Sequence, residues 1–276
     1  MEQHRSYRAS GRRRRRSPLG RFLTFFVICL VLFLGISVFF RVSEIRVEGD
    51  TRYTQEEVIR AAGIEFGTHL FFVDYESARQ NILSSLPYAE QVRIRRRFPN
   101  RVEIDVTDTV ALAVIYTEGG YLLLDRRARM LERLEYAPIQ RLVDVFGMGD
   151  PILPRAGEVL AFGEEGRGRL VYLQDILGTF FTLGLSPRVS ELNMSDVYDP
   201  RFLYDDRFVV RLGPHQNLHH KLSMLMGIVA YLDEHETGTI DLSGDNPFWS
   251  PYIVEDFDGD SADTDADAAG EGEDED

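Results

Sequence analysis

The strongest constraint on this chain is an unbroken apolar run at residues 22–40, FLTFFVICLVLFLGISVFF, which contains no charged residue. At a rise of about 1.5 Å per residue, a helix over these 19 residues would nearly match the ~30 Å hydrocarbon core of a bilayer. A cleaved signal peptide is the alternative, but its apolar segment is shorter and ends in small residues. This run ends in Phe39-Phe40 and is followed by Arg41, so it lacks the small residues of a cleavage site. The sequence therefore predicts an uncleaved membrane-spanning helix at residues 22–40.

The charges on the two sides of this run are very different. Residues 1–21 carry eight Arg and one acidic residue, a net charge of +7. Because cytoplasmic flanks carry the positive excess, this basic tail is predicted to be cytoplasmic and the rest of the chain extracytoplasmic. Residues 255–276 carry twelve acidic residues, no basic residue and no apolar periodicity, so we expect a disordered acidic tail.

Composition limits the kinds of partner that the chain can bind. The formal net charge is -14, and the acidic residues lie almost entirely outside the basic tail. Acidic surface repels phosphate, so we expect no nucleic-acid partner. The single cysteine, Cys29, excludes an intrachain disulfide framework and a zinc site built on cysteines. Stability must therefore come from buried apolar surface.

Residues 42–110 have the pattern of a compact domain. Thr54 and Glu57 are spaced as a capping box that starts a helix, and Asp74 starts a second helix that Pro87 ends. Alternating apolar and polar residues mark one strand before these helices and two after them. The expected order is therefore β-α-α-β-β, with the strands around residues 45–47, 92–94 and 102–106 and the helices over 54–63 and 74–87.

Residues 111–254 are expected to form a second domain, rich in β-structure and with a mostly antiparallel sheet. Leu170, Leu173 and Leu177 have helical spacing and predict a helix over 164–183. Similar spacing predicts a helix over 218–235. The strands are expected at residues 112–116, 121–125, 130–134, 189–194, 208–212 and 240–242. The predicted fold class of the whole chain is α+β.

Short motifs in both domains have the same order and the same spacing of Gly, Pro and apolar residues as in one known family. The first domain contains Ile45-x-Val47-x-Gly49, Gly67-x-x-Leu70-Phe71, Leu86-Pro87 and Arg97-x-Pro99-Asn100. The second contains Tyr121-Leu122-Leu123-Leu124-Asp125, Val210-x-Leu212-Gly213, Lys221-Leu222 and Thr239-Ile240-Asp241-Leu242. Over about residues 22–250 the chain resembles the FtsQ/DivIB family of bacterial cell-division proteins. Two turns depart from the family pattern: residues 107–110, and Arg126-Arg127-Ala128, where a Gly is expected.

The resemblance implies a single-pass bacterial membrane protein concentrated at the division septum. Residues 42–110 would be a POTRA domain and residues 111–254 the family's β domain. The implied role is non-enzymatic: to recruit and hold FtsB/DivIC-like and FtsL-like division proteins. No cofactor, metal or small-molecule substrate is expected.

The C-terminal end of the β domain is the expected partner-binding edge. Residues 240–242, with their continuation 243–252, are predicted to form a last strand whose free edge can accept a strand or helix from a partner. Aromatic residues of the kind that dominate interfaces gather here. The alternative, that these aromatics only close the sheet, is equally compatible with the sequence. The candidate residues are Ile240, Leu242, Ser243, Gly244, Asp245, Asn246, Phe248, Trp249 and Tyr252.

Other functions fit the sequence less well. A POTRA-containing envelope transport or assembly component would need further POTRA units, and a membrane-anchored hydrolase would need a catalytic set, yet Gly-x-Ser-x-Gly is absent from the sequence. His215 and His219 could share a helix face as metal ligands. Pro214, however, places His215 at a helix start, which favours a solvated side chain.

Overall fold

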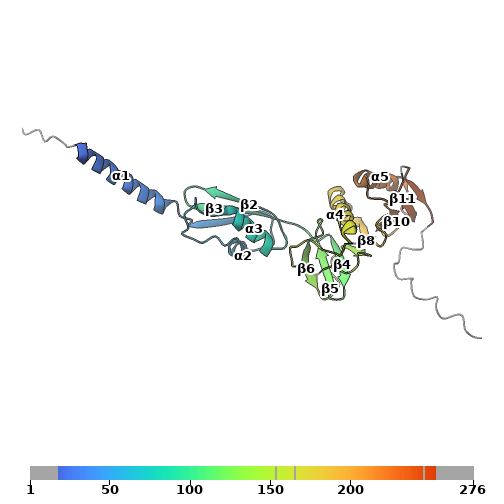
Figure 1. Ribbon diagram of the computed structural model, residues 1–276. Helices are drawn as coiled ribbons and strands as arrows, with labels where there is room; N and C mark the ends of the chain where they lie inside the picture. Colours follow the sequence, from blue (N-terminus) through green and yellow to red (C-terminus); the bar gives the residue numbers. More distant parts are fainter. Residues whose placement is uncertain (1–17, 153, 165, 245, 253–276) are drawn as a thin grey trace, which may run out of the picture.

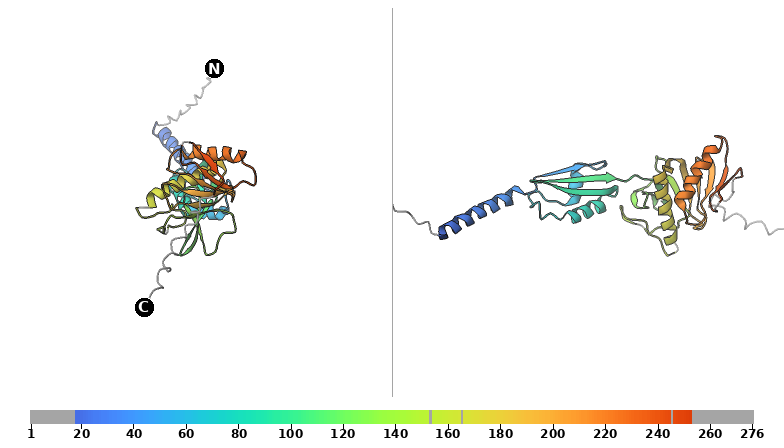
Figure 2. Two further views of the ribbon diagram at one scale, coloured as in Figure 1. Left: turned by 90° about the vertical axis from the view of Figure 1, so that its right-hand side faces the viewer. Right: turned by 90° about the horizontal axis from the view of Figure 1, so that it is seen from above.

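The structure is a computed structural model that describes residues 18–252 except 153, 165 and 245 (Figure 1). A long helix, a small domain with a three-stranded sheet and a larger domain with a nine-stranded sheet follow one another in sequence and in space (Figures 1 and 2). This is the predicted α+β class. The acidic tail predicted at residues 255–276 lies outside the described residues, as does most of the basic tail predicted at residues 1–21.

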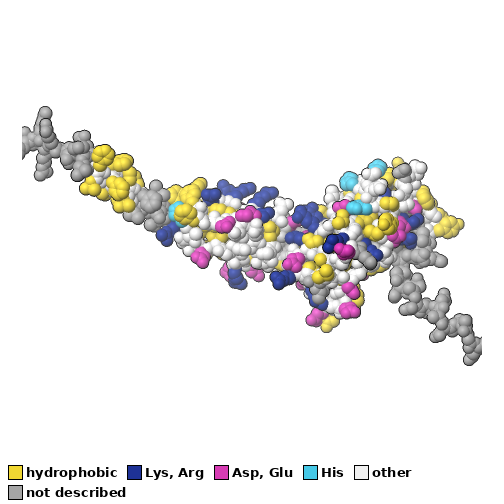
Figure 3. Space-filling view, in the orientation of Figure 1, with side chains coloured by type: hydrophobic (Ala, Val, Ile, Leu, Met, Phe, Trp, Pro, Cys, Tyr) yellow, Lys and Arg dark blue, Asp and Glu magenta, His cyan; other side chains and the backbone are white. Residues whose placement is uncertain are grey.

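Helix α1 (Pro18–Phe39) covers most of the apolar run. Its described side chains are largely exposed, Phe22, Phe25 and Phe26 among them, and they form an apolar surface around the helix (Figure 3). Within the part of the chain that the structure describes, no helix has both the length and the hydropathy needed to cross a membrane. The membrane span expected at residues 22–40 is therefore not shown by the structure.

The small domain has the predicted β-α-α-β-β order. Its sheet has the strand order β1-β3-β2, with β1 parallel and β2 antiparallel to the central β3. Val58, Ile82 and Ile104 are fully buried in a core that belongs to this domain alone. The elements are β1 (Glu44–Glu48), α2 (Gln55–Ala62), α3 (Tyr75–Ser85), β2 (Ala89–Arg97) and β3 (Arg101–Asp108).

Both helices of the small domain start at the predicted caps. The Thr54 hydroxyl accepts a hydrogen bond from the Glu57 amide at 3.3 Å, and the Glu57 carboxylate accepts one from the Thr54 amide at 2.8 Å. The Asp74 carboxylate accepts one from the Ser77 amide at 3.0 Å. These amide hydrogen bonds favour the ionised carboxylates and lower the pKa of Glu57 and of Asp74. The stability that they contribute is present above the unfolded-state pKa and is lost as pH falls through the lower folded-state pKa.

The larger domain is an open sheet with the strand order β12-β11-β10-β9-β8-β7-β4-β5-β6. Five neighbouring pairs are antiparallel and three are parallel, which confirms the mostly antiparallel prediction. Its helices are α4 (Gly166–Leu183) and α5 (Leu218–Tyr231), with a 3-10 turn η1 (Ser186–Arg188) after α4. The strands are β4 (Ala113–Thr117), β5 (Gly120–Leu124), β6 (Met130–Leu134), β7 (Val143–Phe146), β8 (Val189–Asn193), β9 (Arg201–Tyr204), β10 (Phe208–Arg211), β11 (Gly238–Asp241) and β12 (Phe248–Ser250).

The structure differs from the sequence prediction at short elements and at one helix end. The strands β7 and β9 were not predicted, and β12 lies within the predicted continuation 243–252 of the last strand, which the structure divides into β11 and β12. Helix α5, which was predicted to reach residue 235, ends at Tyr231 because Leu232 already has extended backbone angles, φ -89° and ψ 142°.

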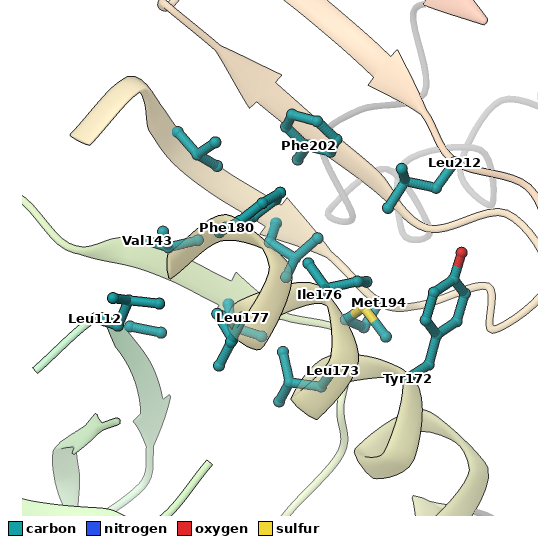
Figure 4. Close-up of a cluster of buried hydrophobic side chains, with 14 of the residues drawn as sticks. Leu112, Val143, Tyr172, Leu173, Ile176, Leu177, Phe180, Met194, Phe202 and Leu212 are labelled. Carbon is teal, nitrogen blue, oxygen red and sulfur yellow. The ribbon is translucent and has the colours of Figure 1, made fainter. Parts of the chain in front are cut away.

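The core of the larger domain lies between α4 and the sheet (Figure 4). Leu173, Ile176 and Leu177 point from one face of α4 toward buried strand and loop residues, as the predicted helical spacing requires. Phe180 of α4 meets Phe202 of β9 edge to face, with ring centroids 5.1 Å apart. This packing binds segments that are distant in sequence into one body and so fixes the position of the C-terminal strands.

We expect replacement of Thr54 with alanine to destabilise α2. The substitution removes both hydroxyl contacts of the capping box, which costs about 1 kcal/mol and should make α2 amides exchange with solvent deuterium about fivefold faster. Ser85→Ala is the control, since this exposed residue lies at the other end of a helix in the same domain. Equal exchange rates in the two variants would show that the cap does not hold the helix.

Candidate functional site

The nine-stranded sheet ends at β12, close to the C-terminal limit of the described residues. The strands β11 and β12 form an antiparallel pair in which Ile240 lies opposite Trp249 and Asp241 opposite Phe248. Beyond β12 the Thr239 hydroxyl donates a hydrogen bond to the Tyr252 carbonyl at 2.8 Å, which extends the connection. Among the described residues β12 has a strand neighbour on one side only. Among the described strands, β12 is therefore one of the two free edges of the sheet, with β6 at the opposite end, and the strand predicted at 240–242 is the inner neighbour of β12.

Eight of the nine candidate residues fall into three groups. Ile240 and Leu242 are fully buried in the core and have no surface to offer a partner. Ser243, Gly244 and Asn246 lie in the connection between β11 and β12, where the Ser243 amide and hydroxyl both donate to the Asp241 carboxylate. Asp245 lies outside the described residues. The remaining three, Phe248, Trp249 and Tyr252, are the aromatics on and just after β12.

The three aromatics divide between the two roles that the sequence left open. Trp249 is half-buried and packs against the core, so it helps to close the sheet. Phe248 is 58% exposed and Tyr252 is 80% exposed. Large apolar surface exposed at an unpaired edge is typical of a binding site. Phe248 and Tyr252 are therefore the residues of the predicted set best placed to contact a partner.

An ion-pair network beneath this hairpin was not predicted from the sequence. Arg211 of β10 lies 2.7 Å from the Asp199 carboxylate and 2.9 Å from that of Asp241 on β11. Asp199 also accepts a hydrogen bond from the Gly213 amide at 3.2 Å. The Asp199 carboxylate raises the pKa of Arg211 above its usual range, so this guanidinium stays charged. The three residues lie far apart in sequence and only the strand pairing joins them, so no local pattern could have indicated the network.

The histidines considered as metal ligands have other contacts. His215 Nε2 lies 2.6 Å from the Asp175 carboxylate, and its ring stacks on Tyr172 at 4.3 Å between centroids. His219 and His220 lie in the first turn of α5. Over the described part of the chain, no three His, Cys, Asp or Glu side chains are grouped so that they could hold a metal ion.

A second surface feature is the junction between the two domains. A cleft of about 820 Å³ opens there, lined by residues of both domains, with Arg52, Tyr88, Glu132 and Tyr136 among them. The Arg52 guanidinium stacks over the Tyr88 ring at 3.9 Å, and the Tyr88 hydroxyl donates to Glu132 on β6 at 3.0 Å. Polar contacts thus close one side of the junction.

Both turns that depart from the family pattern lie at this junction. Arg126 and Arg127, in the turn after β5, both pair with Glu90 at the start of β2. Ala128 takes the left-handed backbone conformation, φ 54°, at the position where a Gly was expected, and its side chain is fully buried. In the other turn, Asp108 accepts a hydrogen bond from the Arg52 amide at 2.7 Å. The turn at Arg126-Arg127-Ala128 therefore coincides with contacts that join the domains, whereas the Arg52–Asp108 hydrogen bond lies within the small domain.

Comparison with known proteins identifies similar chains. The family model described as "POTRA domain, FtsQ-type" matches residues 40–108, which is the small domain. A cell division protein FtsQ from Anaeromyxobacter sp. (strain K) is 29% identical over 199 residues, which cover 70% of this chain and 63% of that relative, less than two thirds of its length. A cell division protein DivIB from Clostridium botulinum (strain Loch Maree / Type A3) is 23% identical over 80% of this chain and 86% of its own length. A cell division protein FtsQ from Syntrophotalea carbinolica is 24% identical over 78% and 79%, respectively.

We expect replacement of Gly238 with alanine to detach β12 from β11. Gly238 has φ +139°, and a Cβ atom there would lie 2.0 Å from the Ser250 carbonyl oxygen, so the two strands cannot keep their register. Trp249 is the only tryptophan, and its emission should shift to longer wavelength as it becomes solvated. Gly244→Ala is the matched control, because a Cβ there meets nothing within 4 Å. An unchanged spectrum for Gly238→Ala would show that the hairpin does not depend on this glycine.

Proposed function

We propose that this chain, which the FtsQ-type POTRA domain and its relatives assign to the FtsQ/DivIB family, is a non-enzymatic scaffold of the bacterial division machinery. The names of the relatives support a role in cell division. In this proposal the nine-stranded domain recruits and holds FtsB/DivIC-like and FtsL-like proteins at the septum. The POTRA domain contributes to localisation or contacts other membrane division proteins.

The observation that carries the proposal is the unpaired side of β12. An edge strand presents free backbone N–H and C=O groups, and a partner segment can pair with them and extend the sheet. β12 has only three residues, so backbone pairing with it provides few hydrogen bonds. Most of the affinity must then come from side chains. Phe248, the first residue of β12, and Tyr252, two residues after the end of β12, supply such anchors.

The order of the elements also suits a scaffold. The proposed contact lies at the far end of the molecule from α1, and the two domains between them are joined by the Glu90 ion pairs and the Tyr88 hydrogen bond (Figure 1). Each domain has its own hydrophobic core. The chain can therefore present β12 at a defined distance from its N-terminal helix.

A single-pass membrane anchor at residues 22–40, with a cytoplasmic N-terminus, is part of the proposal. Its support is the uncharged apolar run and the eight Arg within residues 1–21, which favour this orientation. The same arrangement places both domains outside the cytoplasm, on the side of the membrane where the septal wall is made.

We expect Phe248→Ala and Tyr252→Ala each to weaken binding to the extracytoplasmic part of the FtsB/DivIC-like protein by about fivefold or more, because truncating an aromatic anchor costs about 1 kcal/mol or more. Binding can be measured by isothermal titration calorimetry. Both side chains are largely exposed, so the free energy of unfolding should be almost unchanged.

Tyr116→Ala is the matched control for these variants. Tyr116 is 66% exposed and lies on β4, six strands away from β12 in the same sheet. It should bind the partner as the unaltered chain does. Full affinity in the Phe248 and Tyr252 variants, with circular dichroism unchanged, would contradict the assignment of this edge.

A fluorescent fusion to the full chain should concentrate at midcell in dividing bacteria. A POTRA-containing envelope transport or assembly component, the alternative function, would be distributed around the envelope instead. The control is the same fusion in cells whose division is blocked before septum assembly, where the midcell band should disappear. Uniform envelope fluorescence in dividing cells would contradict the septal role.

A further inference from the structure

An exposed aromatic cluster lies where α1 joins the small domain, and the proposed function leaves it without a role. We define the aromatic cluster as Phe40, Phe71, Phe72 and Phe98. The Phe40 ring lies 5.6 Å from that of Phe71 and 6.0 Å from that of Phe98, and these two lie 5.7 Å apart. Phe71, Phe72 and Phe98 are 48%, 82% and 64% exposed. Three phenylalanines thus face outward at one end of a domain whose core is already filled.

The cluster is a fixed part of the fold. The Leu70 amide donates to the Phe40 carbonyl at 2.8 Å, and the Val42 amide donates to the Thr68 carbonyl at 2.9 Å. Leu70 itself is fully buried, so the loop turns one apolar side chain inward and the next two outward. The backbone of the loop is therefore tied to the residues that directly follow α1.

Unpaired positive charge lies beside the aromatic rings. Within the described residues, Arg41, which follows Phe40, and Arg96 form no ion pair with a carboxylate, and both are exposed. The Arg96 guanidinium lies over the rings of Phe71 and Tyr75, at 5.8 and 5.2 Å. Figure 3 shows the apolar surface at the α1 junction continuing into a row of basic side chains on the small domain.

We propose that the aromatic cluster and these arginines form a membrane-contact surface that seats the small domain in the headgroup region of an anionic bilayer. Phenylalanine side chains on an exposed apolar face insert into the boundary between headgroups and acyl chains, and guanidinium groups pair with lipid phosphates. The surface is continuous with α1, since the rings of Phe39 and Phe40 are in contact at 5.7 Å. Binding of a water-soluble protein would not explain why the aromatic cluster lies at the end of an apolar helix. The inference rests on the proposed membrane anchor.

The test uses the full chain in vesicles of phosphatidylglycerol and phosphatidylcholine whose acyl chains carry bromine near the headgroup, and for the probe on α1 also in vesicles whose acyl chains carry bromine near their ends. Trp249 is first replaced with Phe, so that each further variant carries a single tryptophan as a probe. Phe72→Trp reports on the aromatic cluster, Val31→Trp on α1 and Tyr116→Trp on the far domain. We expect bromine to reduce the Phe72→Trp emission about twofold or more and to leave the Tyr116→Trp emission unchanged.

The three probes separate failure of this inference from failure of the proposed anchor. Quenching of Val31→Trp with no quenching of Phe72→Trp would overturn the membrane-contact surface, and would point to a protein partner for the cluster instead. No quenching of Val31→Trp would overturn the anchor, and the inference with it.

The arginines are tested in the Phe72→Trp protein by adding Arg41→Glu and Arg96→Glu. Quenching should then be lost in anionic vesicles, as it should be for the unaltered arginines at high salt. The control adds Arg155→Glu and Arg167→Glu, which change the net charge equally at exposed positions of the larger domain. Equal loss in both pairs would show that only net charge matters and would overturn the role of Arg41 and Arg96.

Discussion

Burial of one face of α4 against the nine-stranded sheet is the interaction on which the larger domain depends. The chain has a single cysteine and hence no disulfide framework, so apolar contacts must hold together strands that extend from Ala113 to Ser250. Leu173, Ile176, Leu177 and Phe180 meet strands from both halves of the sheet along one helix. The open sheet held in this way ends at β6 on one side and at β12 on the other. The exposed edge at β12 is thus a result of the same packing that makes the domain stable.

The domain junction uses a different kind of contact. The two hydrophobic cores do not merge, and the junction instead contains the Glu90 ion pairs, the Tyr88 hydrogen bond and a cleft. Polar contacts of this kind stabilise a domain junction less than a shared hydrophobic core does, but their strength depends on the relative orientation of the groups that they join. They favour one relative orientation of the domains without making either domain depend on the other for folding.

Sequence reasoning succeeded where the determining contacts are local. The caps at Thr54 and Asp74 act within one helical turn, and β6 was predicted with its observed bounds, as a short apolar segment after an Arg-rich turn. It failed where pairing partners are distant: β7 is only four residues long and pairs with β4 and with β8, which lies beyond α4 in sequence. The C-terminal edge of the sheet shows both outcomes. A last strand was predicted over residues 240–252, but the chain forms two strands there, β11 and β12, and Ile240 and Leu242 are buried. Pairs such as Arg126 with Glu90 have no sequence signal, although the unusual turn that contains the arginine was recognised.

The order α1, small domain, larger domain has a consequence for the partners. Because β12 lies at the end of the molecule farthest from α1, any membrane-anchored protein that pairs with it must reach past both domains (Figure 1). A partner whose extracytoplasmic segment is too short cannot make the contact, whatever its affinity in solution. Under the proposed function, the molecule therefore selects partners by the length of their extracytoplasmic segments as well as by side-chain fit.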